Sequence, residues 1–139
     1  MRQAVCQFPI ETRGKGLYEF TAQVERWVGQ QGMKTGLLTL YCRHTSASLL
    51  IQENADPDVR TDLLRYFERV VPESSRDYVH TLEGPDDMPA HIRSAMTGVD
   101  LSIPLISGEL ALGTWQGIYL FEHRSSPHRR SVAAHLLGE

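Results

Sequence analysis

Apolar and polar residues alternate over several short stretches of the chain, a pattern typical of half-buried β-strands. The alternation is clearest between Leu101 and Leu105, and it returns around Ile118 and Leu120. Further strands are predicted over residues 2–10, 36–43, 47–52 and 130–137. The last of these strands is expected at an edge or in the centre of a sheet.

Three segments have the spacing and the end residues of helices instead. The first begins at Thr21, whose hydroxyl can cap it, and ends near Gly29 or Gly32. The second begins at Asp56-Pro57, and a shorter third begins at Asp87. Helices inserted among such strands predict an α+β fold with a mixed, mainly antiparallel sheet and two or three helices. No repeat or long linker divides the chain, so we expect residues 1–139 to form one domain.

Gly113-Thr114-Trp115-Gln116 interrupts the strand pattern near the end of the chain. Gly113 and Gly117 leave bare backbone on either side of this block, and glycine within a strand marks a bulge or the close approach of a ligand. A bulged core strand and a ligand site therefore both remain open, and in the second case Gln116 would bind substrate. Trp115 is expected in the core or at a subunit interface, with ring stacking on a ligand as the alternative.

Composition narrows the function classes. The net charge of −3 gives no electrostatic reason to expect nucleic acid as a partner. No apolar run is long enough to span a bilayer, so we expect a soluble cytoplasmic protein. Cys6 and Cys42 are expected to be buried free thiols, with a disulfide as the alternative.

Three histidines, His44, His80 and His91, lie at the ends of predicted elements rather than inside apolar runs. Three imidazoles can bind zinc or a similar divalent ion and leave a fourth position for water or substrate. Each histidine taken alone is better explained as a hydrogen-bonded structural residue. Glu53 is expected to act with His44 in catalysis, as a general base or as the carboxylate that orients a ligating imidazole. Asp86 and Asp87 are weaker candidates for that role.

Two further groups suggest an anionic ligand. Thr45 follows His44, and because the sequence contains no serine-nucleophile motif, its hydroxyl is better explained as a hydrogen-bond donor to an anion or as a strand residue. The turn between the last two strands carries Arg124, Arg129 and Arg130. Arginine binds phosphate or carboxylate through two parallel hydrogen bonds, although a solvated basic turn explains the cluster as well.

Several motifs in a fixed order give the chain a family resemblance. His44–Leu49 reads His-Thr-x-Ala-x-Leu, Gln52–Asn54 reads Gln-Glu-Asn, and Gly113–Gln116 reads Gly-Thr-Trp-Gln. With these motifs the chain resembles the YjbQ family, an uncharacterised conserved family also labelled secondary thiamine-phosphate synthase. His80 and His91 fall on recurring histidine positions of that family. Its Gly-Pro-Arg turn is replaced here, so Arg129 or Arg130 is expected to do the work of the arginine.

The resemblance implies a mixed sheet with helices, assembled as a homo-oligomer, with a trimer favoured. It also implies a metal-assisted enzyme on a small phosphorylated or anionic substrate, either a thiamine-phosphate synthase-like transferase or a metal-dependent hydrolase. The ion would be zinc, or magnesium if a diphosphate is transferred. The alternative is a non-catalytic oligomeric protein that binds a metal or a small anion.

Overall fold

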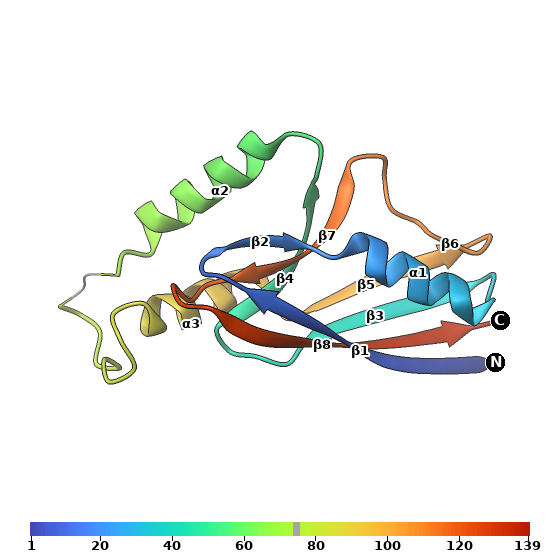
Figure 1. Cartoon of the computed structure of the whole chain (residues 1–139), viewed down its shortest axis with the longest axis horizontal. Helices are drawn as coiled ribbons and strands as arrows, with labels where there is room; N and C mark the ends of the chain where they lie inside the picture. The colour runs from blue at the N-terminus through green and yellow to red at the C-terminus, as the bar shows by residue number, and fades with distance from the viewer. Residues whose placement is uncertain (74–75) are drawn as a thin grey trace.

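The computed structural model describes residues 1–73 and 76–139. Figure 1 shows three helices arranged around extended strands, with the two chain ends side by side. The strands are β1 (Arg2–Thr12), β2 (Gly16–Glu19), β3 (Gly36–Cys42), β4 (Ala47–Glu53), β5 (Asp100–Ile106), β6 (Glu109–Leu110), β7 (Gln116–Glu122) and β8 (His128–Gly138). The helices are α1 (Thr21–Gln31), α2 (Pro57–Val70) and α3 (Asp87–Thr97).

The strands form two sheets in which every described pair is antiparallel. The larger sheet has the order β1-β8-β3-β5-β6 and the smaller one the order β2-β7-β4. The last long strand, β8, therefore lies in the interior of its sheet, between β1 and β3, rather than at an edge. These features confirm the predicted α+β fold class.

The hydrophobic core lies between the inner faces of the two sheets and α1. In β3 the alternate residues Leu38, Leu40 and Cys42 are buried, because successive side chains of a strand point to opposite faces. Val24 and Val28 of α1 pack into the same cluster. One face of β3 is therefore buried in the core, and the residues of its other face are exposed or half-buried.

The other two helices are held differently. None of the described residues of α2 is fully buried, although Phe67 packs edge-on against Phe121 of β7 with ring centroids 5.3 Å apart. In α3 the buried positions include Arg93 and Ser94, whereas Met96 is 54% exposed. The helix docks through polar contacts, since Ser94 Oγ donates to the carbonyl of Ala47 at 2.9 Å.

The helix ends partly follow the sequence signals. Asp56 caps α2 as predicted, since its carboxylate accepts from the N–H of Asp58 at 2.9 Å. Gly32 ends α1 in the left-handed region at φ 68°. The expected cap at Thr21 is wrong, because the N-cap is Phe20. The Thr21 hydroxyl instead accepts from the N–H of Ile118 at 2.8 Å and so joins α1 to β7.

The Gly-Thr-Trp-Gln block is a turn before β7 and not a bulged core strand. Its backbone closes through the N–H of Gln116 and the carbonyl of Gly113 at 3.1 Å. Trp115 is 61% exposed, so the prediction that it packs in the core of this chain is wrong. β7 begins at Gln116, and Gly117 lies inside this strand, where an added Cβ would lie 2.6 Å from Oε2 of Glu19.

Both cysteines are free thiols, as predicted, although only Cys42 is buried and Cys6 is half-buried. Burial raises the pKa of the Cys42 thiol. None of the described helices has the length and apolar character needed to cross a membrane.

Candidate metal centre

The candidate site is built on the first turn of α3. Asp87 is the first residue of the helix, and its side chain is only 2% exposed. His91 follows four residues later, so both side chains lie on one face of the helix. Nε2 of His91 lies 3.0 Å from Oδ2 of Asp87.

A second histidine reaches the same carboxylate oxygen from the segment between α2 and α3. Nε2 of His80 lies 2.6 Å from Oδ2 of Asp87, and the rings of His80 and His91 have centroids 5.4 Å apart. One ligand atom from each residue can be chosen so that all three lie within 4.8 Å of one another. Two imidazole nitrogens and one carboxylate oxygen therefore converge at the start of α3.

The hydrogen bonds of His91 indicate that a cation lies between its ring and Asp87. Its Nδ1 lies 2.8 Å from the carbonyl oxygen of Thr45, which can only accept a hydrogen bond. Nδ1 must therefore carry a proton, and in a neutral ring Nε2 then presents a lone pair to Asp87. Two lone pairs repel unless a cation, either a proton or a metal ion, lies between them. A ligating histidine in proteins typically donates its second N–H to a carbonyl in this way.

Arg124, from the turn after β7, holds the carboxylates of this region in place. Its guanidinium contacts Oδ1 of Asp87 and Oδ2 of Asp86, each at 2.9 Å. Burial opposes the charge of Asp87, but hydrogen bonding to His80 and the charges of His91 and Arg124 outweigh it and lower its pKa. Asp87 is thus an ionised, oriented carboxylate whose Oδ2 faces the histidines.

His44 lies outside this group. Its Nε2 accepts a hydrogen bond from the N–H of Ser131 in β8 at 2.8 Å, and burial together with the charge of Arg130 lowers its pKa. The described structure therefore brings together two of the three expected histidine ligands. Asp87, expected only as a general base or orienting partner, joins them; its spacing of one helical turn from His91 was the available signal.

Glu53 and Gln116 lie at the far end of the smaller sheet. They are paired in register, and β4 runs from Ala47 near the candidate site to Glu53, about 20 Å at the usual strand rise. The carboxylate of Glu53 accepts from the N–H of Asp56, and the amide oxygen of Gln116 accepts from the N–H of Gly113. Both side chains thus organise turns away from the histidines.

The two expected anion-binding arginines also have other partners. Arg129 is 80% exposed and pairs with Glu11 at 3.1 Å. Arg130 is buried and donates to both carboxylate oxygens of Glu122, at 2.8 and 2.5 Å. Burial opposes the charge of Glu122, but the hydrogen bonds from Arg130 and from Thr12 outweigh it and lower its pKa.

Thr45 links the candidate site to the buried pair of Glu122 and Arg130. Its carbonyl bonds His91, and the next residue, Ser46, accepts from Arg130 through its hydroxyl at 3.0 Å. The N–H of Arg124 in turn donates to Glu122 at 3.2 Å. The buried ion pair therefore joins the two chain segments that orient His91 and Asp87.

Similarity to known proteins agrees with this architecture. The family described as "UPF0047 protein YjbQ-like" matches residues 6–139. The UPF0047 protein sll1880 of Synechocystis is 56% identical over 94% of this chain and 88% of its own length. The UPF0047 protein YjbQ of Escherichia coli O157:H7 is 42% identical over 94% of both chains.

Solved structures give the same assignment. An uncharacterised conserved protein of the YjbQ/UPF0047 family from Clostridium acetobutylicum has a TM-score of 0.87 and 34% identity, covering 95% of this chain and 99% of its own. A hypothetical protein from Aeropyrum pernix has a TM-score of 0.88 and 28% identity, covering 98% and 99%. Because the family match and these relatives extend over nearly the whole chain, the protein belongs to the YjbQ-like UPF0047 family.

Proposed function

We propose that this protein is a metal-assisted enzyme that acts on a small phosphorylated or anionic compound. The observation that carries the proposal is the convergence of His80, Asp87 and His91. Two imidazoles with one carboxylate suit zinc, whereas magnesium prefers an all-oxygen set. A divalent ion bound there would polarise a phosphoryl or carbonyl oxygen of the substrate.

The residues around the ligands have defined tasks in this proposal. Thr45 fixes the tautomer of His91 through its carbonyl, so that Nε2 is directed at the ion. Arg124 holds Oδ1 of Asp87 and leaves Oδ2 for the ion. Such preorganised partners spare the site the cost of reorienting its ligands when substrate binds.

The finer proposal is a transfer like that of thiamine-phosphate synthase, in which a hydroxymethylpyrimidine diphosphate joins a thiazole phosphate and diphosphate departs. This reaction needs charge stabilisation on the departing diphosphate, which a divalent ion and an arginine together provide. Magnesium would then be the expected ion. Metal-dependent hydrolysis of a phosphate ester uses the same groups and is the neighbouring alternative.

The second candidate function is a non-catalytic protein that binds a metal or a small anion. One observation favours it: the carboxylates considered as general bases have other roles. Glu53 lies at the other end of β4, and Asp86 accepts from Arg124 and from the N–H of Ser125. Asp87 itself is part of the ligand set, which leaves it poorly placed to move protons.

We further propose that copies of the chain assemble as a homo-oligomer, with a trimer favoured, in the cytoplasm. The outer face of the larger sheet supports self-association, since Val5, Leu37 and Leu137 are 74%, 44% and 37% exposed there. The two free thiols are in line with a reducing compartment. Light scattering coupled to size-exclusion chromatography tests the assembly, and a monomer at all concentrations would contradict it.

Metal analysis by plasma mass spectrometry on untagged protein tests the site. We expect about one zinc or similar ion per chain, and loss of most of it in Asp87→Asn and His91→Gln. His135→Gln is the matched control, because this histidine bonds Gln3 on the outer face of the larger sheet, away from the candidate site. Equal metal content in all four proteins, or none in any of them after reconstitution, would overturn the site.

An assay of substrate turnover distinguishes the metal-assisted enzyme from the non-catalytic binding protein. The reconstituted protein is offered the two thiamine precursors and a panel of phosphate esters, and release of diphosphate or phosphate is followed. An enzyme loses its turnover in Asp87→Asn but keeps it in His135→Gln. Stoichiometric metal without turnover of any phosphorylated compound would instead support the binding protein.

A further inference from the structure

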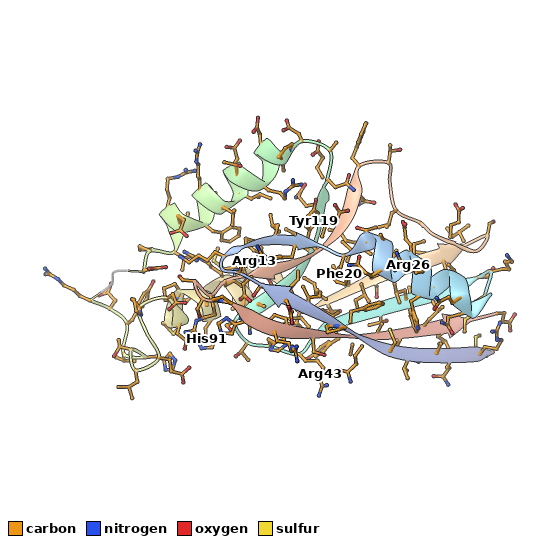
Figure 2. All side chains as sticks on the ribbon, viewed as in Figure 1. Arg13, Phe20, Arg26, Arg43, His91 and Tyr119 are labelled. Carbon is orange, nitrogen blue, oxygen red and sulfur yellow. The ribbon has the colours of Figure 1, made fainter. Side chains whose placement is uncertain are left out.

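A hollow of about 540 Å³ lies between the turn that joins β3 to β4 and strand β8. Its polar lining consists of Tyr41, Arg43, His44, Thr45, Ser46 and Arg130. None of the described residues that line it carries a carboxylate. Two of the lining residues are arginines, and Figure 2 shows Arg43 projecting below the larger sheet, on a different side of the ribbon from Tyr119. The hollow therefore presents donors and positive charge.

His44 lines this hollow, and its ring can donate a hydrogen bond. Its Nε2 accepts the N–H of Ser131, so that lone pair is already used. A neutral ring with Nε2 as acceptor must carry its proton on Nδ1. The lowered pKa of His44, caused by burial and by the charge of Arg130, agrees with a neutral ring. Neutral imidazoles are effective donors to a negatively charged oxygen.

The positive charge comes from Arg43 rather than from the arginines of the later turn. Within the described part of the chain, the side chain of Arg43 donates from Nη1 to the neutral amide oxygen of Gln7 at 3.1 Å and forms no ion pair with a carboxylate. Arg130 is neutralised by Glu122, and Arg129 is paired with Glu11. Among the lining residues, Arg43 thus supplies a charge that no carboxylate cancels.

Thr45 connects the hollow to the candidate metal centre. Thr45 lines the hollow, and its carbonyl accepts from Nδ1 of His91 at 2.8 Å. Thr45 alone therefore separates an anionic group in the hollow from the imidazole of His91, which would bind the ion. A small substrate can span the two sites, with its anion at one end and its reacting oxygen at the other.

From these contacts we propose that the hollow binds the oxyanion of the substrate, a phosphate monoester or a carboxylate, through Arg43, the Nδ1–H of His44 and the hydroxyl of Thr45. This inference rests on the proposed function, because it assigns the anionic end of the same substrate. It replaces Arg129 and Arg130 as the residues that recognise the anion. His44 becomes a binding residue instead of a metal ligand.

Calorimetric titration of chelator-treated protein with inorganic phosphate, and separately with acetate, tests the site without any metal. Tighter binding of phosphate identifies a phosphate monoester as the source, and tighter binding of acetate identifies a carboxylate. We expect Arg43→Met to weaken the preferred anion about tenfold or more, since a charge-assisted hydrogen bond is lost. The matched control Arg129→Gln should stay within about twofold of the unchanged protein, because that arginine already pairs with Glu11.

The variant His44→Gln tests whether the ring of His44 donates a hydrogen bond to the anion. Its side chain can still accept from Ser131 but lacks a donor at the Nδ1 position, so anion binding should fall about fivefold or more while the fold is kept. Nitrogen-15 NMR of the ring should show the proton on Nδ1. A proton on Nε2, no binding of either anion, or equal losses in Arg43→Met and Arg129→Gln would overturn the proposal. Asp87→Asn should still bind the anion, so failure of the metal centre is distinguishable from failure of this site.

Discussion

The buried imidazole of His123 leads to a quantitative prediction about acid stability. The residue is 1% exposed and follows β7, where Nε2 contacts Oγ of Ser48 at 2.9 Å. Its Nδ1 has no hydrogen-bond partner among the described atoms. Burial, together with the nearby charges of Arg93 and Arg130, lowers the pKa of His123 from 6.5 to about 3.

The sign of the effect follows from proton linkage. The unfolded chain binds a proton at His123 near pH 6.5, while the folded chain does so only near pH 3. Stability is therefore fully present above pH 6.5 and falls as the solution becomes more acidic. Over this window the slope is about 1.4 kcal/mol per pH unit, so about 2 kcal/mol is lost between pH 6.5 and pH 5.

Urea unfolding between pH 6.5 and pH 5 measures this loss against the variant His123→Gln. The variant is less stable at pH 7 because the contact with Ser48 is weakened, but its pH slope should be smaller by about 1.4 kcal/mol per unit. His135→Gln removes a half-buried histidine on the outer face of the larger sheet and should keep the slope of the unchanged protein. Parallel slopes for the protein and His123→Gln, or an NMR titration of the His123 ring near pH 6, would refute the reasoning.

Other predictions concern packing and charge. Glu122→Gln leaves Arg130 buried without its counter-charge and should lower the free energy of unfolding by about 3 kcal/mol in urea titrations; a loss below about 1 kcal/mol would contradict it. Gly36→Ala places a methyl group against the backbone of Leu137 across the β3–β8 pair and should cost about 2 kcal/mol, seen as a lower Tm. Gly29→Ala, in α1 with nothing within 4 Å of the new carbon, should raise stability by up to about 1 kcal/mol. Equal shifts for the two alanines would refute the steric argument.

The structural features that depend on residues close together in the sequence could be predicted from it. The Asp56 cap needs only the N–H two residues later, and Gly32 needs only its own backbone freedom. The buried positions of β3 follow from the alternation of strand side chains. Thr21 misled this reasoning, because its hydroxyl bonds a strand that lies 97 residues away in the chain.

The sequence likewise predicted some features of the candidate site and missed others. The positions of histidines relative to predicted elements singled out His80 and His91, which the fold brings together with Asp87, and the family motifs placed the chain among its relatives. The motifs did not show that Glu53 and Gln116 lie together at the opposite end of β4 from Thr45. The motifs also did not show that Arg130 forms an ion pair with Glu122.

The sequence by itself determined the α+β class, most strands and helix ends, and the family, since these depend on short-range periodicity and on motifs in order. Tertiary structure alone decided which side chains share a site. The docking of α3 beside β4 brings His91 to Thr45, and the segment before α3 brings His80 to Asp87. Such contacts depend on sheet register and on the docking of α3, which couple residues far apart in the chain and leave no local pattern to read.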